Sequence, residues 1–158
     1  MSSESSTVIR TLRAQDLDAI VRIDARVTGR QRPAFLKVKL AKALGEGVQM
    51  SLGAEVDGKL VGFLMGAVYY GEFGQPEPIA SIDTLGVHPD FRKRGVGLAL
   101  WAQFVSNLKG LQITRIHTEV DWKNRALLGF LERVGFVPAP RLCLEKILDP
   151  TRDEPGEE

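Results

Sequence analysis

Cysteine and histidine are scarce in this sequence, and their scarcity excludes two kinds of site. The chain has 158 residues and one cysteine, Cys143, so no disulfide can form within it, as is compatible with a reducing cytoplasm. Because Leu142 and Leu144 flank this cysteine and no histidine adjoins it, we expect a buried structural thiol rather than a nucleophile. The two histidines, His88 and His117, have no partner at a metal-ligand interval, so we expect no metal.

An excess of charge of either sign is also absent. Lys and Arg number 21 against 20 Asp and Glu, which gives a formal net charge of +1. The molecule therefore has no overall field that would hold nucleic acid or an anionic membrane. The N-terminus lacks the basic start and apolar run of a targeting segment, and no apolar stretch approaches the ~20 residues that span a bilayer. We expect a cytoplasmic protein without nucleic-acid or membrane partners.

Hydrophobic residues make up 44% of the chain, which suits one globular domain with a single core. We expect this domain to span residues 1–148 and residues 149–158 to form an acidic, disordered tail. The predicted strands lie at 8–12, 50–56, 60–70, 79–87 and 113–120, and the turn Asp57-Gly58 joins the second to the third. The predicted helices lie at 17–27, 33–44, 96–107 and 124–134. Two closing strands are expected within 136–147, interrupted by Pro138 and Pro140.

The stretch 87–100 combines the end of an apolar strand, a basic triplet, two glycines and the start of an amphipathic helix. Gly95 and Gly97 have no Cβ to block a close approach by a ligand. A helix N-terminus carries unpaired N–H groups and about half a positive charge, and so favours an anion. The stretch therefore predicts a phosphate-binding loop, against the alternative of a basic turn that merely solvates a helix start.

Two common phosphate loops do not fit this stretch. A P-loop needs Lys followed by Ser or Thr after its last glycine, and here Leu98-Ala99 follow. A dinucleotide fingerprint needs a small residue where Leu100 stands. The form Arg-x-x-Gly-x-Gly at Arg92, Gly95 and Gly97 instead resembles the acetyl-CoA pyrophosphate loop of the GNAT superfamily of N-acetyltransferases.

A second signature of this family follows in order along the chain. Asn124, an apolar helix and then Gly135-Phe136 resemble the family segment in which the Asn contacts the pantetheine arm and the Gly-Phe opens the next strand. The resemblance implies an α/β fold with a mixed, mostly antiparallel sheet of about seven strands, splayed between the fourth and fifth and flanked by about four helices. It also implies that acetyl-CoA binds at Leu85, Gly86, Val87, Arg92, Lys93, Arg94, Gly95, Val96, Gly97, Leu98 and Asn124.

Two carboxylates are candidate bases, which acetyl transfer needs because a primary amine is mostly protonated at neutral pH. Asp83 should share a strand face with Leu85 and Val87 by the two-residue period, and many GNAT enzymes carry a glutamate at this position. Glu119, five residues before Asn124, matches the proposed base of the ribosomal-protein alanine N-acetyltransferases, the type with the closest likeness. A surface ion pair is the alternative for Glu119, and the sequence does not choose between the two acids.

The chain departs from the family where the general acid is expected. Many members have a tyrosine seven residues after the Asn, and Leu131 stands there in this sequence. Water would then protonate the leaving thiolate, or Tyr69 or Tyr70 would do so. We expect packing in the core as the main role of both tyrosines.

The acceptor side has weaker candidates. Arg30 and Arg32 are candidates to meet a carboxylate on the substrate, and the alternative is that both are solvated and paired with surface acids. The loop 71–78 is a candidate lid, or only a long turn, and Phe73 and Tyr70 are further candidate contacts.

The sequence thus predicts an acetyl-CoA-dependent N-acetyltransferase that acts by direct attack of a primary amine, on a protein or a small molecule. The rival hypothesis is a CoA-binding regulatory or interaction module that kept the anchor and lost catalysis. A homodimer is compatible with both hypotheses.

Overall fold

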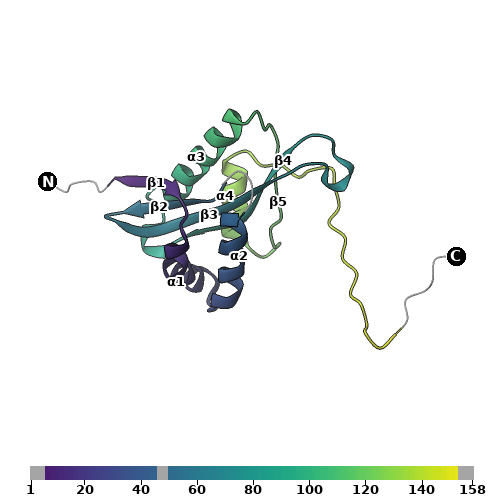
Figure 1. Cartoon of the computed structure of the whole chain (residues 1–158), viewed down its shortest axis with the longest axis horizontal. Helices are drawn as coiled ribbons and strands as arrows, with labels where there is room; N and C mark the ends of the chain where they lie inside the picture. The colour runs from purple at the N-terminus through teal and green to yellow at the C-terminus, as the bar shows by residue number, and fades with distance from the viewer. Residues whose placement is uncertain (1–5, 46–49, 153–158) are drawn as a thin grey trace. The chain divides into compact units, whose positions relative to one another are not determined.

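The computed structural model describes residues 6–45 and 50–152. The chain divides into two compact units, residues 1–119 and residues 120–158. In its described part, the first unit contains a sheet and three α-helices, and the second contains one α-helix (Figure 1). The expectation of one domain over residues 1–148 stays a prediction, and residues 153–158 of the expected tail lie outside the described residues.

The sheet of the first unit has five strands in the described ranges, ordered in space as in the sequence. Neighbouring strands are antiparallel except for the last pair, β4 and β5, which is parallel. The mixed α/β fold is therefore as predicted, but the expected count of seven strands is wrong. The strands are β1 (Thr7–Thr11), β2 (Leu52–Val56), β3 (Lys59–Tyr69), β4 (Ile79–Val87) and β5 (Ile116–Thr118).

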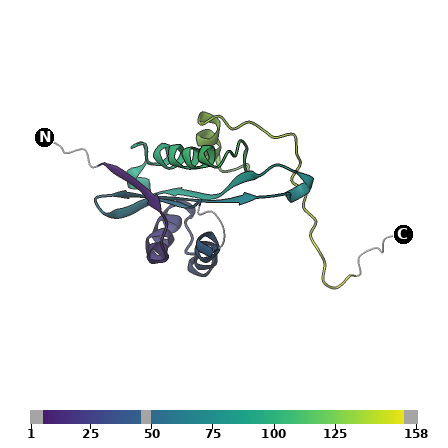
Figure 2. The same cartoon turned by 45° about the horizontal axis from the view of Figure 1, so that its top comes forward.

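Helices cover both faces of this sheet. Figure 2 shows α1 (Leu17–Thr28) and α2 (Pro33–Gly45) on one face and α3 (Val96–Gly110) on the other. The core between the sheet and the first two helices is a cluster of Leu12, Ile20, Ile23, Leu36, Leu40, Phe63 and Met65. Helix α1 ends where the sequence predicts, because Gly29 takes a left-handed φ of 76° and its N–H donates to Ala25 O at 2.9 Å.

Two glycines of β3 allow α3 to pack closely on its face. A Cβ at Gly62 would lie 3.0 Å from the Val96 side chain. A Cβ at Gly66 would lie 2.7 Å from the Phe104 ring and 2.9 Å from the Ser81 carbonyl oxygen. Buried residues of α3 recur at four-residue intervals from Val96 through Leu100 and Phe104 to Leu108, so one stripe of the helix meets the sheet.

The tight hairpin between β2 and β3 is also as predicted. Asp57 and Gly58 both have positive φ, at 51° and 75°, as a two-residue turn matched to strand twist requires. A three-residue 3-10 helix, Glu72–Gly74, occupies the predicted loop between β3 and β4.

The second unit contains α4 (Arg125–Arg133). Gly135, at φ 101°, ends this helix: its N–H donates to Glu132 O at 3.1 Å, and the next N–H donates to Leu131 O at 2.9 Å. This is a Schellman motif. Gly135 therefore ends a helix, and the expectation that Gly135-Phe136 opens a strand is wrong.

No strand follows α4 in the described residues, which run to residue 152. We name residues 137–148 the C-terminal segment. Its large apolar side chains are exposed, with Val137 at 80% and Leu142, Leu144 and Ile147 each at 85%. Cys143 is exposed with them, so the expectation of a buried thiol is also wrong. Pro138 and Pro140 have no N–H to donate, which removes two ladder hydrogen bonds from the first expected strand.

Candidate functional site

The chain leaves the end of β4 through a short, ordered turn. His88 N–H donates to Val61 O at 2.7 Å, which ties the turn to β3. The 3-10 helix Pro89–Phe91 follows, and its Asp90 N–H donates to His88 Nδ1 at 3.1 Å. The His88 side chain thus caps the N-terminus of this 3-10 helix. These contacts fix the place from which the basic triplet begins.

Helix α3 begins directly after this turn, with Gly95 as N-cap at a left-handed φ of 77°. The first hydrogen bond of the helix runs from Ala99 N–H to Gly95 O at 2.9 Å. The N–H groups of Val96, Gly97 and Leu98 therefore have no acceptor within the helix. The first turn has no acidic residue and Gly95 has no side chain to cap it, so these amides are suited to an external anion.

The basic triplet Arg92, Lys93 and Arg94 is exposed beside these amides. Arg94 lies over the Phe91 ring, with its Cζ atom 5.0 Å from the ring centroid. None of the ion pairs within residues 6–45 and 50–152 includes a member of the triplet. The charges therefore remain available to an anionic ligand.

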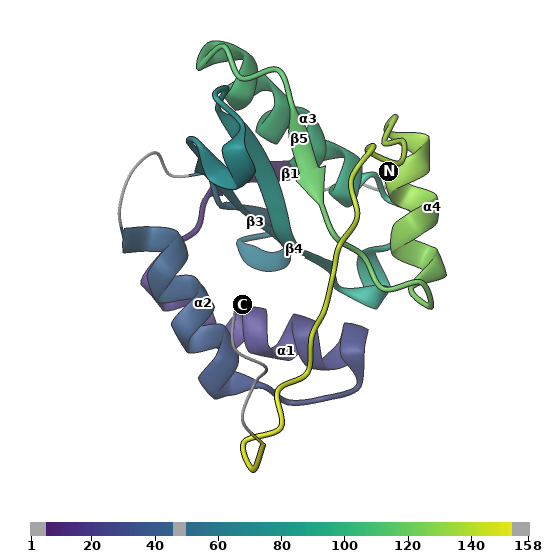
Figure 3. The ribbon, with the colours of Figure 1, turned by 90° about the vertical axis from the view of Figure 1, so that its right-hand side faces the viewer.

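Strand β4 has an open edge next to this loop. Strand β5 pairs with it only through Ala80↔Ile116, Ser81↔His117 and Ile82↔Thr118. β4 continues to Val87, so its last residues have no partner from β5 on that side (Figure 3). This confirms the expected splay between the fourth and fifth strands. An open strand edge offers backbone donors and acceptors to an extended ligand.

A bulge at Asp83 changes the face on which this side chain lies. The register runs from Met65↔Thr84 directly to Gly66↔Ile82, which leaves Asp83 as the extra residue of β4. A bulge places two successive side chains on similar sides and so breaks the alternation.

The predicted face for Asp83 is therefore wrong. Asp83 points to the side of the sheet that α2 covers, where Lys39 contacts it. Val87 is paired with Gly62, whose Cβ position faces Val96 on α3. Asp83 and Val87 thus lie on opposite faces.

Asp83 is held by two polar neighbours. Lys39 Nζ donates to its Oδ2 at 3.3 Å, and Ser81 Oγ lies 3.5 Å from its Oδ1. The Asp83 side chain is 34% exposed and that of Lys39 is 28% exposed, so the pair is open to solvent on one side.

Glu119, the other candidate base, comes directly after β5. Because Ile82↔Thr118 is the last pair of the two parallel strands, Asp83 and Glu119 both follow the same rung. Glu119 is exposed, and the ion pairs found in the described part of the chain do not include it. Both carboxylates thus border the point where the strands separate.

The two arginines proposed for the acceptor differ. Arg32 donates through Nε and Nη2 to the buried carboxylate of Asp24, at 3.0 and 2.6 Å, and its Cζ lies 4.7 Å from the Phe35 ring centroid. Hydrogen bonding to Asp24 raises the pKa of the Arg32 guanidinium. Arg30 is exposed, and its N–H donates to Thr28 Oγ1 at 3.2 Å. Arg32 is therefore occupied by a structural partner, whereas no contact of this kind is seen for the Arg30 guanidinium in the described residues.

The aromatic candidates at the β3–β4 loop are exposed, with Tyr70 at 70% and Phe73 at 91%. Tyr69, at 37%, is also exposed, so the expectation that the tyrosines pack in the core is wrong. These residues border the loop rather than the core.

In the second unit, Asn124 is the N-cap of α4. Its Oδ1 accepts a hydrogen bond from Leu127 N–H at 3.2 Å, which leaves the side-chain amide donors for another partner. Leu131, where the family tyrosine is expected, is 4% exposed. This side chain is therefore buried, and as an aliphatic group it has no proton to donate.

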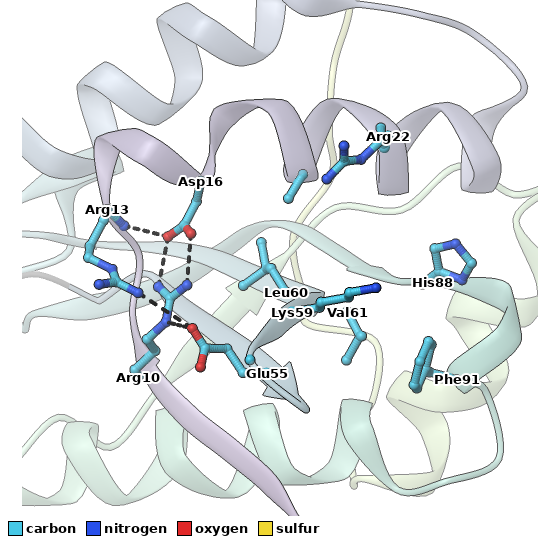
Figure 4. A pocket seen from close by; sticks show the side chains of 12 residues that line it. Arg10, Arg13, Asp16, Arg22, Glu55, Lys59, Leu60, Val61, His88 and Phe91 are labelled. Carbon is cyan, nitrogen blue, oxygen red and sulfur yellow. Dashed lines mark hydrogen bonds and ion pairs between the residues drawn. The ribbon is translucent and has the colours of Figure 1, made fainter. Parts of the chain in front are cut away.

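A pocket that the sequence did not predict lies along the N-terminal half of α1 (Figure 4). It has a volume of about 640 Å³ and reaches His88 and Phe91 beside the loop. On one side Arg10 donates to both oxygens of Asp16, each at 2.7 Å, and to Glu55 Oε1 at 2.6 Å. Arg10 and Glu55 are 45 residues apart, so no local pattern indicates their contact.

Asp16 is the acid of this network whose pKa is shifted. Its burial acts to raise the pKa, but hydrogen bonds from Arg10 and from the Arg13 N–H outweigh burial and hold the pKa below its usual value. The residues described contain no group of three or more His, Cys, Asp or Glu that could hold a metal ion. None of the helices described is long and apolar enough to span a membrane.

Comparison with known proteins gives consistent matches. The acetyltransferase (GNAT) family matches residues 17–136. An acetyltransferase of Pectobacterium atrosepticum is 30% identical over 145 residues, which are 92% of this chain and 98% of that protein.

Solved structures share the fold. An aminoglycoside N-acetyltransferase in complex with CoA has a TM-score of 0.76 at 17% identity, over 93% of this chain and 98% of that one. A ribosomal-protein-alanine N-acetyltransferase from Brucella melitensis has a TM-score of 0.73 at 18% identity, over 90% of this chain and 99% of that one. The family match over residues 17–136 and the relative at 30% identity show that the chain belongs to the GNAT family of acetyltransferases.

Proposed function

We propose that the protein is an N-acetyltransferase that moves an acetyl group from acetyl-CoA to a primary amine by direct attack on the thioester. The observation that carries the proposal is the position of Asp83 and Glu119. Both carboxylates follow the last rung between β4 and β5, at the end of the open strand edge that begins beside the basic loop. The loop that would bind acetyl-CoA and the carboxylates that would accept a proton therefore lie at the two ends of the open edge of β4.

The loop before α3 fits a diphosphate. It offers the amides of Val96, Gly97 and Leu98, which have no acceptor in the helix. It also offers the charges of the basic triplet, which form no ion pair with the described residues. The open edge of β4 at residues 85–87 fits an extended, amide-bearing arm. Acetyl-CoA supplies both groups and an activated thioester.

The proton from the acceptor ammonium goes to Asp83 or Glu119, directly or through water. Asp83 accepts a hydrogen bond from Lys39 Nζ at 3.3 Å, so a cationic amine already lies within reach of this carboxylate. The Val87 N–H is our candidate donor to the thioester carbonyl oxygen, since a fixed N–H contributes a few kcal/mol to oxyanion stabilisation. Leu131 cannot donate a proton, and a thiol has a pKa of about 8.5, so solvent can protonate the leaving thiolate.

Paired variants test the base. Asp83→Asn and Glu119→Gln should both keep CoA binding in calorimetry, and at least one should lose turnover by about 100-fold, the lower range of general-base catalysis. The acceptor panel contains an alanyl peptide, a lysyl peptide and an aminoglycoside. The first and the last are chosen because similar structures are named as a ribosomal-protein-alanine and an aminoglycoside N-acetyltransferase. Glu132→Gln, an exposed acid on α4, is the matched control and should keep full activity.

A CoA-binding module without catalysis is the second candidate, and two observations favour it. Leu131 replaces the general acid, and Lys39 already occupies Asp83. Such a protein would release heat with CoA, acetylate no member of the panel, and show no difference between the variants. Absence of heat with CoA at millimolar concentration would contradict both candidates.

A further inference from the structure

Lys39 places an amine at one of the two candidate bases. It projects from α2 beside Leu36 and Leu40, which pack in the core and hold the helix on the sheet. Its Nζ lies 3.3 Å from Asp83 Oδ2, across 44 residues of sequence. The position of this ammonium is therefore set by the packing of α2.

That position is the one an acceptor amine must take if Asp83 is the base. A general base acts on a proton donor within about 2.6–3.2 Å, and Lys39 Nζ is only slightly farther away. Lys39 thus occupies the place of the acceptor before any substrate arrives.

The open edge of β4 leads from the loop to the same point. From Val87 to Asp83 the strand covers about 13 Å at ~3.3 Å per residue. Beyond Asp83 the rung Ile82↔Thr118 closes the gap between the strands. A donor that is anchored at the loop and extended along the edge therefore ends near Asp83 and Lys39.

We infer that Lys39 is itself an acceptor and that the enzyme acetylates its own Lys39 Nζ. The inference rests on the proposed function, with Asp83 as the base. Asp83 takes one proton from the Nζ ammonium, and the neutral Nζ forms a C–N bond to the thioester carbonyl carbon. The C–S bond breaks, CoA leaves as a thiolate, the nitrogen loses a second proton to solvent, and the thiolate gains one. The balance is one ammonium and one thioester giving one acetyl-lysine, one thiol and one free proton.

The modification also changes the site. An acetylated Lys39 has no charge, so it no longer forms an ion pair with Asp83. The carboxylate is then released to a second amine, and the modified enzyme differs from the unmodified one in its access to external acceptors.

The same helix supplies internal standards for the test. Lys37 and Lys42 are exposed on α2, and the ion pairs in the described ranges include neither. Acetyl-CoA that reacts without catalysis should modify these two lysines at least as fast as the half-buried Lys39. A preference for Lys39 therefore reports catalysis by the fold.

The experiment incubates the full chain with acetyl-CoA and follows acetylation of each lysine by peptide mass spectrometry over time. We expect the mass of one acetyl group on Lys39, formed at a first-order rate that is independent of protein concentration. Lys39→Arg should remove the mark, Asp83→Asn should slow it by at least about tenfold, and Lys42→Arg should leave it unchanged. Melting curves check that each variant is folded. Lys39→Arg keeps a cation beside Asp83, so this variant still tests the assignment of the mark to Lys39 if Asp83→Asn does not fold.

The outcomes separate this inference from the proposed function. If CoA binds and a free amine is acetylated, but Lys39 is modified no faster than Lys37 and Lys42, the inference is wrong and the proposed function stands. If Lys39 is modified and no amine of the panel is, the inference stands and the acceptor panel is wrong. If calorimetry detects no CoA binding, both are wrong.

Discussion

At the scale of single residues, Arg10 is hydrogen-bonded to two carboxylates of the first unit. It joins Asp16, which is 7% exposed, to Glu55 on β2. Arg10→Ala should cost about 3 kcal/mol of unfolding free energy, because it leaves a nearly buried carboxylate without its partner. Urea unfolding followed by circular dichroism measures this loss.

Arg13→Ala is the matched control for this prediction. The Arg13 side chain is 59% exposed and contacts the same Glu55 at 3.4 Å, so its loss should cost less than about 1 kcal/mol. Equal losses for the two variants would contradict the proposed role of Arg10.

Asp16 should also give stability a measurable pH dependence. Because its folded pKa lies below the unfolded value of about 3.9, its contribution is fully present above that value. The contribution is lost as the pH falls through the lower, folded pKa. The difference in unfolding free energy between the wild type and Asp16→Asn should therefore be largest near neutral pH and shrink below about pH 4. A difference that stays constant down to pH 2, about two units below that reference, would contradict this assignment.

At the scale of elements, the contact between β3 and α3 depends on Gly66. A Cβ there would meet the Phe104 ring at 2.7 Å and the Ser81 carbonyl at 2.9 Å. Gly66→Ala should destabilise the protein by roughly 1–3 kcal/mol through overpacking. Gly110→Ala, in the last turn of α3 with open space around its Cβ position, should be neutral or slightly stabilising. Thermal unfolding of the two variants measures the contrast.

The sequence predicted the elements whose ends are marked locally. Gly29 ends α1 and Asp57-Gly58 forms the hairpin turn, because both need positive φ and carry residues that accept it. The bulge at Asp83 was not predicted, since it depends on register between β3 and β4. The two strands predicted within residues 136–147 are not formed in the described part of the chain.

The candidate site was predicted in part for the same reason. Arg92, Gly95 and Gly97 lie within six residues of one another in the sequence, and so their joint role was visible as a motif. The contact of Lys39 with Asp83 spans 44 residues, and no local pattern encodes it. The sequence indicated that Arg32 could bind a carboxylate, but it did not indicate that the carboxylate would be that of Asp24.

At the scale of the whole molecule, the exposed backbone of the C-terminal segment should be the first target of protease. Arg141 lies within it, and every residue from 137 to 152 is exposed. Brief digestion with trypsin should cut after Arg141, because proteases bind extended, accessible chain. Intact-mass analysis should show a product that ends at this residue, and Arg141→Gln should delay its appearance. A first cut inside the sheet, with Arg141 intact, would contradict the prediction.

The same segment bears on colloidal behaviour. The side chains of Leu142, Leu144 and Ile147 expose apolar surface to water. At a net charge of +1, electrostatic repulsion between two molecules is weak. The light scattered per unit of protein concentration should therefore rise with concentration near neutral pH. It should fall when the pH is moved away from neutrality, because the molecules then carry a larger net charge of the same sign.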